Sequence, residues 1–198
     1  MPIAAIVLDA AAALYTAGAV FLMTRKDGHF SKERLKAFRY FTIESNILSA
    51  LSCIAAAVCL LCGAQALPRW ALLLRYTGTV SVAVTFLTVM VFLGPAFGYR
   101  KMLSGGDLYM HLLGPLAAAV SFVFLEPGAR VAGADALFGM LPTLIYGTLY
   151  LYQVVIAKRW EDFYTFNRGG KWPVSFAAMV AGTALICAAL CAARNALH

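Results

Sequence analysis

Long runs of apolar residues alternate with short polar segments along almost the whole chain. Each run is long enough, as a helix rising about 1.5 Å per residue, to cross the roughly 30 Å hydrocarbon core of a bilayer. The pattern therefore predicts an all-α fold, a polytopic transmembrane bundle of six helices formed by residues 1–198 as a single domain. The expected spans are 3–23, 38–64, 70–95, 108–126, 136–157 and 174–193.

The composition agrees with a membrane location and argues against a soluble domain. Hydrophobic residues make up 62% of the 198 residues and charged residues 13%, whereas a soluble domain is about half apolar and one quarter charged. The net charge of +7 comes from bases in the loops, not from a solvated face with stacking aromatics, so we expect no nucleic-acid partner. We expect these bases to contact anionic membrane lipids instead.

Lysine and arginine gather in the loops that follow the first, third and fifth runs, whereas the opposite side holds few of them. Because cytoplasmic loops of membrane proteins carry the excess of Lys and Arg, this bias predicts cytoplasmic loops after those three runs and both termini outside. The first run has its charges after it rather than before it, which is the reverse of a cleavable signal peptide. We therefore expect it to stay in the mature protein.

The second run opens on an unusual polar stretch, "FTIESN" at 41–46. Residues three, four and seven positions apart share a helix face, so Thr42, Ser45, Asn46 and Ser49 form one polar stripe. An asparagine in hydrocarbon costs several kcal/mol, and we expect the stripe to face the bundle interior or a wet cavity. Small polar residues also pack helices together, and that alternative stays open for the stripe.

The fourth run contains "DLYMHLLGP" at 107–115, with Asp107 four residues before His111. A lone histidine in a span often makes only an interhelical hydrogen bond. With Asp107 holding one ring nitrogen, however, the other nitrogen would be free to act as a base. Thr42 and His111 each lie about 5–6 Å below the same interface. If the second and fourth spans adjoin, a nucleophile, a base and an orienting acid share one depth.

These residues predict a threonine nucleophile that is activated by a histidine base. Thr42 would attack an electrophilic carbon, and Asn46, one turn above it, would donate to the developing oxyanion, with Ser45 as the weaker choice. In the fifth run, Tyr146 and Tyr150 either line a lipid pocket or are ordinary interior aromatics. The chemistry needs no cofactor and no metal, and we expect neither.

At these residues the chain resembles the androgen-induced gene and androgen-dependent TFPI-regulating proteins, a family of six-span membrane threonine hydrolases, and their bacterial relatives. The match rests on the two motifs at 41–46 and 107–115 and on six spans over nearly the whole chain. The resemblance implies that Thr42 and His111 are the catalytic pair. It also implies a lipid ester substrate, of the type of a fatty acid ester of a hydroxy fatty acid, and a bacterial inner membrane location. Where the family's first motif is expected to have glutamine, this chain has Glu44, which we include among the candidate site residues.

Two other classes of function remain open. Asp9 in the first run, Glu44 in the second and Arg75 in the third are ionisable groups in apolar segments, as in a small proton-coupled transporter. The six runs show no clear inverted repeat of the kind that many transporters have, and Asp9 pairing with Arg75 is the simpler alternative. A non-catalytic membrane interaction module is the third reading.

Overall fold

The computed structural model describes residues 2–26, 29–31 and 34–198. In this part of the chain, six helices are long and apolar enough to cross a membrane. They confirm the predicted all-α fold of six spans and indicate an integral, multi-pass membrane protein. The six helices cover 3–23, 41–61, 69–97, 106–125, 133–156 and 172–197.

The first two spans are uninterrupted α-helices, α1 (Pro2–Met23) and α2 (Phe41–Leu61). A minimal antiparallel pair, β1 (Arg25–Lys26) and β2 (His29–Phe30), follows α1. A 3₁₀ turn, η1 (Arg34–Arg39), then leads to α2. Because η1 is a separate turn and Tyr40 is extended, α2 begins at Phe41 and not at the predicted residue 38.

The third, fourth and fifth spans are built from consecutive helical segments, four of which are π turns. The third span comprises α3 (Arg69–Thr88), η2 (Val89–Leu93) and α4 (Gly94–Phe97), and a short α5 (Tyr99–Met102) follows it. The fourth comprises α6 (Gly106–Leu108), η3 (Tyr109–Leu113), α7 (Gly114–Val120) and η4 (Ser121–Leu125). The fifth comprises η5 (Gly133–Met140), α8 (Leu141–Leu151) and η6 (Tyr152–Ile156). A 3₁₀ turn, η7 (Arg168–Gly170), precedes the sixth, α9 (Trp172–Leu197).

Two of the π turns, η2 and η3, lie directly before a Gly-Pro pair. Pro115 has no N–H for the carbonyl of His111 four residues back, and its ring crowds that carbonyl. In η3 the ladder is instead closed by Gly114 N–H donating to the Tyr109 carbonyl, five residues back. Pro95 follows η2 in the same way, with Gly94 N–H bonded to the Val89 carbonyl. Each proline thus widens the helix for one turn, as π-bulges do.

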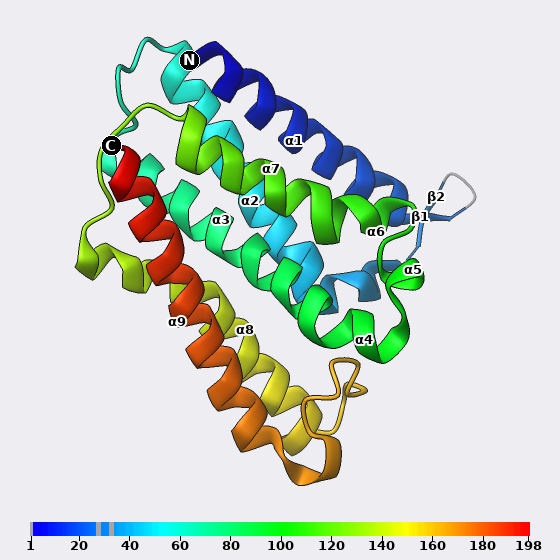
Figure 1. Cartoon of the computed structure of the whole chain (residues 1–198). Coiled ribbons are helices and arrows are strands. Elements are labelled where there is room, and N and C mark those ends of the chain that lie inside the picture. Colours follow the sequence, from blue (N-terminus) through cyan, green and yellow to red (C-terminus); the bar gives the residue numbers. More distant parts are fainter. Residues whose placement is uncertain (1, 27–28, 32–33) are drawn as a thin grey trace.

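The helices form a body and a hairpin, as Figure 1 shows. α2 packs against α1 and α3, and α7 packs against α3 and α1. α8 and α9 form a two-helix hairpin that contacts the body mainly along α3. Both termini lie at one end of the bundle, and the loops after the first, third and fifth spans lie at the opposite end (Figure 1).

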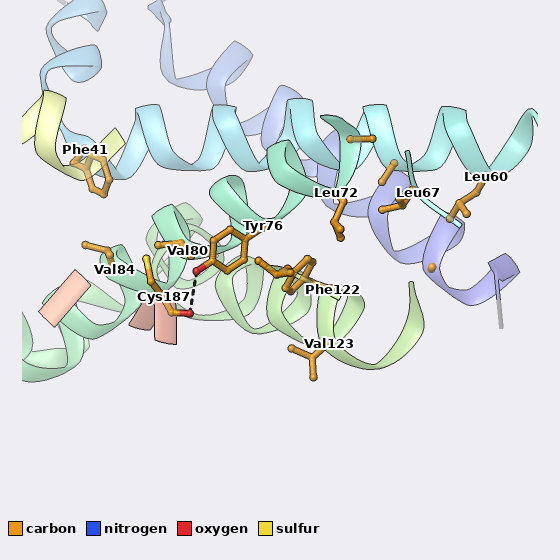
Figure 2. Close-up of a cluster of buried hydrophobic side chains, with 14 of the residues drawn as sticks. Phe41, Leu60, Leu67, Leu72, Tyr76, Val80, Val84, Phe122, Val123 and Cys187 are labelled. Carbon is orange, nitrogen blue, oxygen red and sulfur yellow. Dashed lines mark hydrogen bonds between the residues drawn. The ribbon is translucent and has the colours of Figure 1, made fainter. Parts of the chain in front are cut away.

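A buried apolar cluster joins the hairpin to the body (Figure 2). Tyr76 on α3 is fully buried; its ring lies 5.9 Å from that of Phe122, and its hydroxyl donates to the Cys187 carbonyl on α9 at 2.9 Å. Lipid tails are as apolar as these side chains, so moving a side chain from lipid into the bundle contributes little free energy. Close packing and such interhelical hydrogen bonds therefore hold the helices together. The cluster includes Phe41, the first residue of α2.

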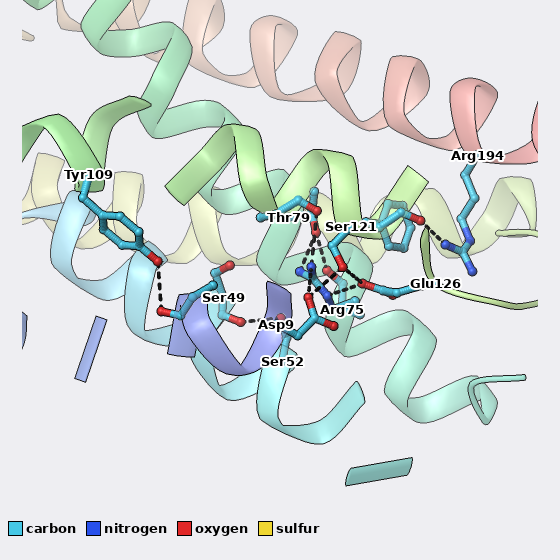
Figure 3. A network of polar contacts seen from close by, with 12 residues as sticks. Asp9, Ser49, Ser52, Arg75, Thr79, Tyr109, Ser121, Glu126 and Arg194 are labelled. Carbon is cyan, nitrogen blue, oxygen red and sulfur yellow. Dashed lines mark hydrogen bonds and ion pairs between the residues drawn. The ribbon is translucent and has the colours of Figure 1, made fainter. Parts of the chain in front are cut away.

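An ionic cluster of Asp9, Arg75 and Glu126 fastens the first, third and fourth spans toward the end that carries the termini (Figure 3). Arg75 Nη2 lies 3.0 Å from Asp9 Oδ1, and its Nε lies 2.6 Å from Glu126 Oε1. The Ser121 hydroxyl donates to both carboxylates, at 2.7 and 3.3 Å. All three charged side chains are buried. Asp9 therefore does pair with Arg75, and Glu126, which the sequence reading did not single out, completes the cluster.

Candidate active site

Thr42 lies in the first turn of α2, where the backbone is short of hydrogen-bond partners. The first amides of a helix have no acceptor within the helix, and Tyr40, at the N-cap position, makes no side-chain cap bond. The acceptor comes from another part of the chain: Phe41 N–H donates to the hydroxyl of Tyr164 at 3.0 Å. The segment between the fifth and sixth spans thus caps the helix that carries Thr42.

His111 lies in the π turn η3 and is buried. Its Nδ1 lies 2.7 Å from the backbone carbonyl oxygen of Met102, the last residue of α5. A carbonyl oxygen only accepts hydrogen bonds, so in the neutral ring Nδ1 carries the hydrogen and Nε2 is left with its lone pair. The loop before the fourth span thereby fixes both the ring orientation and the tautomer.

Nε2 of His111 faces Thr42, with Thr42 Oγ1 at 3.5 Å. The second and fourth spans therefore do adjoin at this depth, which the sequence reading had to assume. A contact of 3.5 Å is long for a hydrogen bond. A hydroxyl beside an unprotonated imidazole nitrogen is the arrangement that activates a threonine or serine nucleophile.

Asp107 does not hydrogen-bond to the ring of His111, although we expected it to. Its carboxylate is exposed and has no hydrogen-bond partner among the described residues, and its backbone N–H donates to the Ser104 carbonyl. The expected contact assumed α-helical spacing, in which residues i and i+4 share a face. The π turn that begins at Tyr109 widens the helix between Asp107 and His111 and brings residue i+5, not i+4, above residue i. The Met102 carbonyl occupies the position that we expected Asp107 to take.

Asn46 and Ser45 are close to Thr42 but their polar groups are engaged elsewhere. Asn46 Nδ2 donates to the carbonyls of Thr42, at 2.8 Å, and Met110, at 3.1 Å. The Ser45 hydroxyl bonds the Thr42 carbonyl at 3.1 Å and the Thr85 hydroxyl at 2.8 Å. Both amide hydrogens of Asn46 are therefore used, one within α2 and the other in joining α2 to the fourth span. Asn46 is placed to position Thr42 beside His111, and not to donate to an oxyanion.

Glu44 lies on the outer surface of α2. Its side chain is exposed, and it forms no ion pair within the described part of the chain. The buried cation Arg75 is paired with Asp9 and Glu126 instead. Position 44 therefore contributes no direct contact to Thr42.

A cavity of about 410 Å³ adjoins Thr42. Its walls come from the start of α2, the end of α3 with η2, the hairpin α8–α9 and residues 164–166. Tyr146 and Tyr150 both line it. The α9 lining runs from Ser175 to Ile186, which at about 1.5 Å per residue extends about 16 Å along the helix. Thr42 thus lines this mostly apolar cavity, and its hydroxyl contacts the buried ring of His111.

Sequence reasoning missed Met102 and Tyr164. Met102 contributes only its backbone carbonyl, so no side-chain pattern could have indicated it. Tyr164 lies in "RWEDFYTFNRGGKW", a polar and aromatic stretch between two spans. Several aromatic residues surround Asp162 in this stretch. Such a concentration of aromatic rings in a loop was the one available sign that the loop folds back into the bundle.

In comparisons with known proteins, no family model, no curated protein and no solved structure matches this chain.

Proposed function

We propose that this protein is a membrane-embedded hydrolase of lipid esters, with Thr42 as the nucleophile and His111 as the general base. The orientation of His111 carries the proposal. Met102 O holds Nδ1 at 2.7 Å, and the unprotonated Nε2 faces Thr42 Oγ1 at 3.5 Å. A histidine that served only to pack two spans would have no need of a free nitrogen beside a hydroxyl at the edge of a cavity.

The reaction proceeds in two halves. Thr42 Oγ1 attacks the ester carbonyl carbon while its proton passes to His111 Nε2, and a tetrahedral oxyanion forms. The bond to the alcohol oxygen then breaks, and His111 returns the proton to the leaving alkoxide. In the second half, water attacks the acyl-threonine and gives its proton to His111. The carboxylic acid leaves, and the proton returns to Thr42 Oγ1.

The cavity supports a substrate with a long apolar chain. Its lining extends about 16 Å along α9 and consists mostly of apolar side chains, whereas Thr42 supplies a reactive hydroxyl. A fatty acyl group would occupy the apolar part with its ester carbonyl at Thr42. The resemblance of the two motifs to membrane threonine hydrolases favours a fatty acid ester of a hydroxy fatty acid within this class.

We further propose that the site opens toward the cytoplasmic face of a bacterial inner membrane, with both termini outside. Thr42 and Met102 lie at the end of the bundle that carries the loops after the first, third and fifth spans (Figure 1). These loops hold most of the lysine and arginine residues, and such loops remain on the cytoplasmic side.

The test is covalent labelling of the purified protein with a fluorophosphonate probe. Thr42→Val removes the hydroxyl and keeps the shape, and His111→Gln removes the base. The control, Thr24→Val, removes another buried threonine hydroxyl, which directly follows α1 and donates to the Phe21 carbonyl of that helix. We expect labelling of wild type and the control, and loss of labelling in both site variants, each shown to be folded by thermal unfolding.

Undiminished labelling of folded Thr42→Val would overturn the proposal. The ionisable groups of the transporter alternative would then be examined by proton uptake into sealed vesicles. At present Asp9 and Glu126 are both engaged by Arg75 and both buried, which supports a structural role for them.

A further inference from the structure

The reaction proposed above creates an oxyanion beside Thr42, and this oxyanion needs a hydrogen-bond donor. Preorganised donors contribute a large part of the rate of acyl transfer. The two residues expected to donate, Asn46 and Ser45, have their hydrogens committed to other groups. Another donor must therefore face the place where the ester carbonyl oxygen would lie.

Three tyrosines line the cavity, and their hydroxyl groups differ in what they bond. Tyr146 donates to the Arg39 carbonyl at 2.6 Å, and Tyr150 donates to Asp162 Oδ1 at 2.9 Å. Tyr164 instead accepts, from Phe41 N–H at 3.0 Å. A hydroxyl has one hydrogen and two lone pairs, so accepting this bond leaves the hydrogen of Tyr164 available to a neighbouring acceptor.

The hydroxyl of Tyr164 lies where negative charge is favoured. It sits at the N-terminus of α2, a helix of 21 residues, where the unpaired amides and the helix dipole together stabilise an anion. Thr42 is the second residue of the same helix and lines the same cavity. An ester carbonyl that is attacked by Thr42 Oγ1 from the cavity would have its oxygen close to this helix end.

The loop around Tyr164 is held in place by a set of partly buried contacts. Asp162 accepts hydrogen bonds from the backbone N–H groups of Phe166, at 2.8 Å, and Asn167, at 2.7 Å, and from the Tyr150 hydroxyl. The Tyr150 hydroxyl also accepts from Tyr164 N–H at 3.2 Å, and the two rings lie 5.3 Å apart. Donors act without reorganisation when they are held in this way.

The protonation state of Tyr164 agrees with a donor role. Burial raises the pKa of its phenol to about 12, although the hydrogen bond from Phe41 N–H and the nearby polar groups of Tyr146 and Thr42 lower it in part. A group whose pKa is raised keeps its proton up to that value. The hydrogen is therefore present throughout the neutral range and is lost only in strong alkali.

We propose that Tyr164 is a catalytic residue whose hydroxyl donates a hydrogen bond to the oxyanion of the tetrahedral intermediate, at the N-terminus of α2. This inference rests on the proposed function. No proton is transferred to the oxyanion; the bond strengthens as negative charge develops on the carbonyl oxygen and weakens when the carbonyl re-forms.

The first measurement compares wild type with Tyr164→Phe on a p-nitrophenyl ester of a long-chain fatty acid. Tyr152→Phe is the control, since Tyr152 is exposed on the hairpin. Loss of one oxyanion donor lowers kcat about 100- to 1,000-fold, and we expect this loss in Tyr164→Phe with KM little changed. An inhibitor that forms a tetrahedral adduct, a long-chain trifluoromethyl ketone, should bind the variant more weakly by a similar factor.

A cap that only stabilised α2 could also lower activity, and the pH profile separates the two roles. A fluorinated tyrosine at position 164 keeps the ring and the hydroxyl but loses its proton at lower pH. The resulting phenolate accepts from Phe41 N–H at least as well but can no longer donate. We expect the alkaline fall in kcat to move to lower pH, and not to move when the same residue is placed at position 152.

These outcomes separate the two proposals. Retained kcat in folded Tyr164→Phe, or an alkaline limb unmoved by the fluorinated residue, would overturn the role of Tyr164 while leaving Thr42 and His111 in place. Labelling that persists in Thr42→Val would instead overturn the proposed function, and the role of Tyr164 with it.

Discussion

The side-chain amide of Asn46 donates to the backbone carbonyl of Met110 at 3.1 Å, and so joins α2 to the turn that holds His111. Asn46→Ala removes this bond and leaves a buried carbonyl without its donor, which costs about 1–3 kcal/mol. We expect a lower free energy of unfolding. We also expect slower fluorophosphonate labelling, because the hydrogen bond that keeps the helices of Thr42 and His111 adjacent is lost. Denaturant unfolding and labelling rates measure the two effects.

Ser52→Ala is the matched control for this change. Ser52 lies on the same helix and is fully buried, but its hydroxyl bonds the Ser49 carbonyl of its own helix. Its removal should leave labelling unchanged. Equal labelling rates in Asn46→Ala and Ser52→Ala would show that the Asn46 bond does not position the pair.

Asp107→Asn should have little effect on activity. Its carboxylate is exposed, and the Met102 carbonyl already holds His111 Nδ1. Where an acid does orient a catalytic histidine, the same change lowers kcat about 10,000-fold. Here we expect labelling and ester hydrolysis within about threefold of wild type. A loss of more than about a hundredfold would mean that Asp107 reaches the ring during the reaction.

Gly182→Leu should shorten the acyl chain that the enzyme prefers. Gly182 lines the cavity from α9, and a Cβ added there meets no atom within 4 Å. A leucine would therefore occupy cavity volume without displacing the helices, and it would favour the helical backbone. We expect kcat/KM for long-chain p-nitrophenyl esters to fall relative to that for acetyl or butyryl esters.

Gly18→Leu provides the control for this substitution. Gly18 also lies within a helix and has open space where its Cβ would be, but it is on α1, away from the cavity lining. Chain-length preference should stay at the wild-type value in this variant. An unchanged preference in Gly182→Leu would show that the acyl group lies elsewhere.

Arg75→Met should destabilise the protein strongly. The change leaves Asp9 and Glu126 buried without their cation, and removal of one partner of a buried ion pair costs about 3–5 kcal/mol. We expect a large drop in the unfolding midpoint in detergent. The triple variant Asp9→Leu, Arg75→Met, Glu126→Leu removes all three charges and should recover much of that loss. No recovery in the triple variant would assign the loss to packing rather than to unpaired charge.

The fold could be predicted because long apolar runs leave few alternatives. Of all residues, 62% are hydrophobic. A segment that crosses a bilayer must form the hydrogen bonds of its backbone N–H and C=O groups internally, as a helix does. Six apolar runs therefore give six helices. The predicted ends differ from the observed ones where local turns intervene, as at η1 before Phe41. The pairing of Thr42 with His111 was within reach too, because both residues lie at the same depth from one side.

The remainder of the site depends on features that side-chain patterns do not encode. A π turn moved Asp107 away from the face of His111, although Pro115 in "HLLGP" gave a sign that the helix is irregular there. The histidine is oriented by a backbone carbonyl, which every residue carries. Tyr164 reaches α2 from 123 positions away in the chain, and no local spacing predicts a contact at that range.

The ionic cluster also has a consequence for how the chain is made. Asp9 enters the membrane with the first span, long before ribosomes have synthesised Arg75 and Glu126. An aspartate at the centre of an isolated span costs about 2.5–3.5 kcal/mol on insertion scales, and Asp9, the eighth residue of α1, bears part of this cost. Its partners belong to the third span and the end of the fourth. The first helix should therefore settle fully into the bilayer only when the fourth has emerged, so that biogenesis depends on late co-translational assembly.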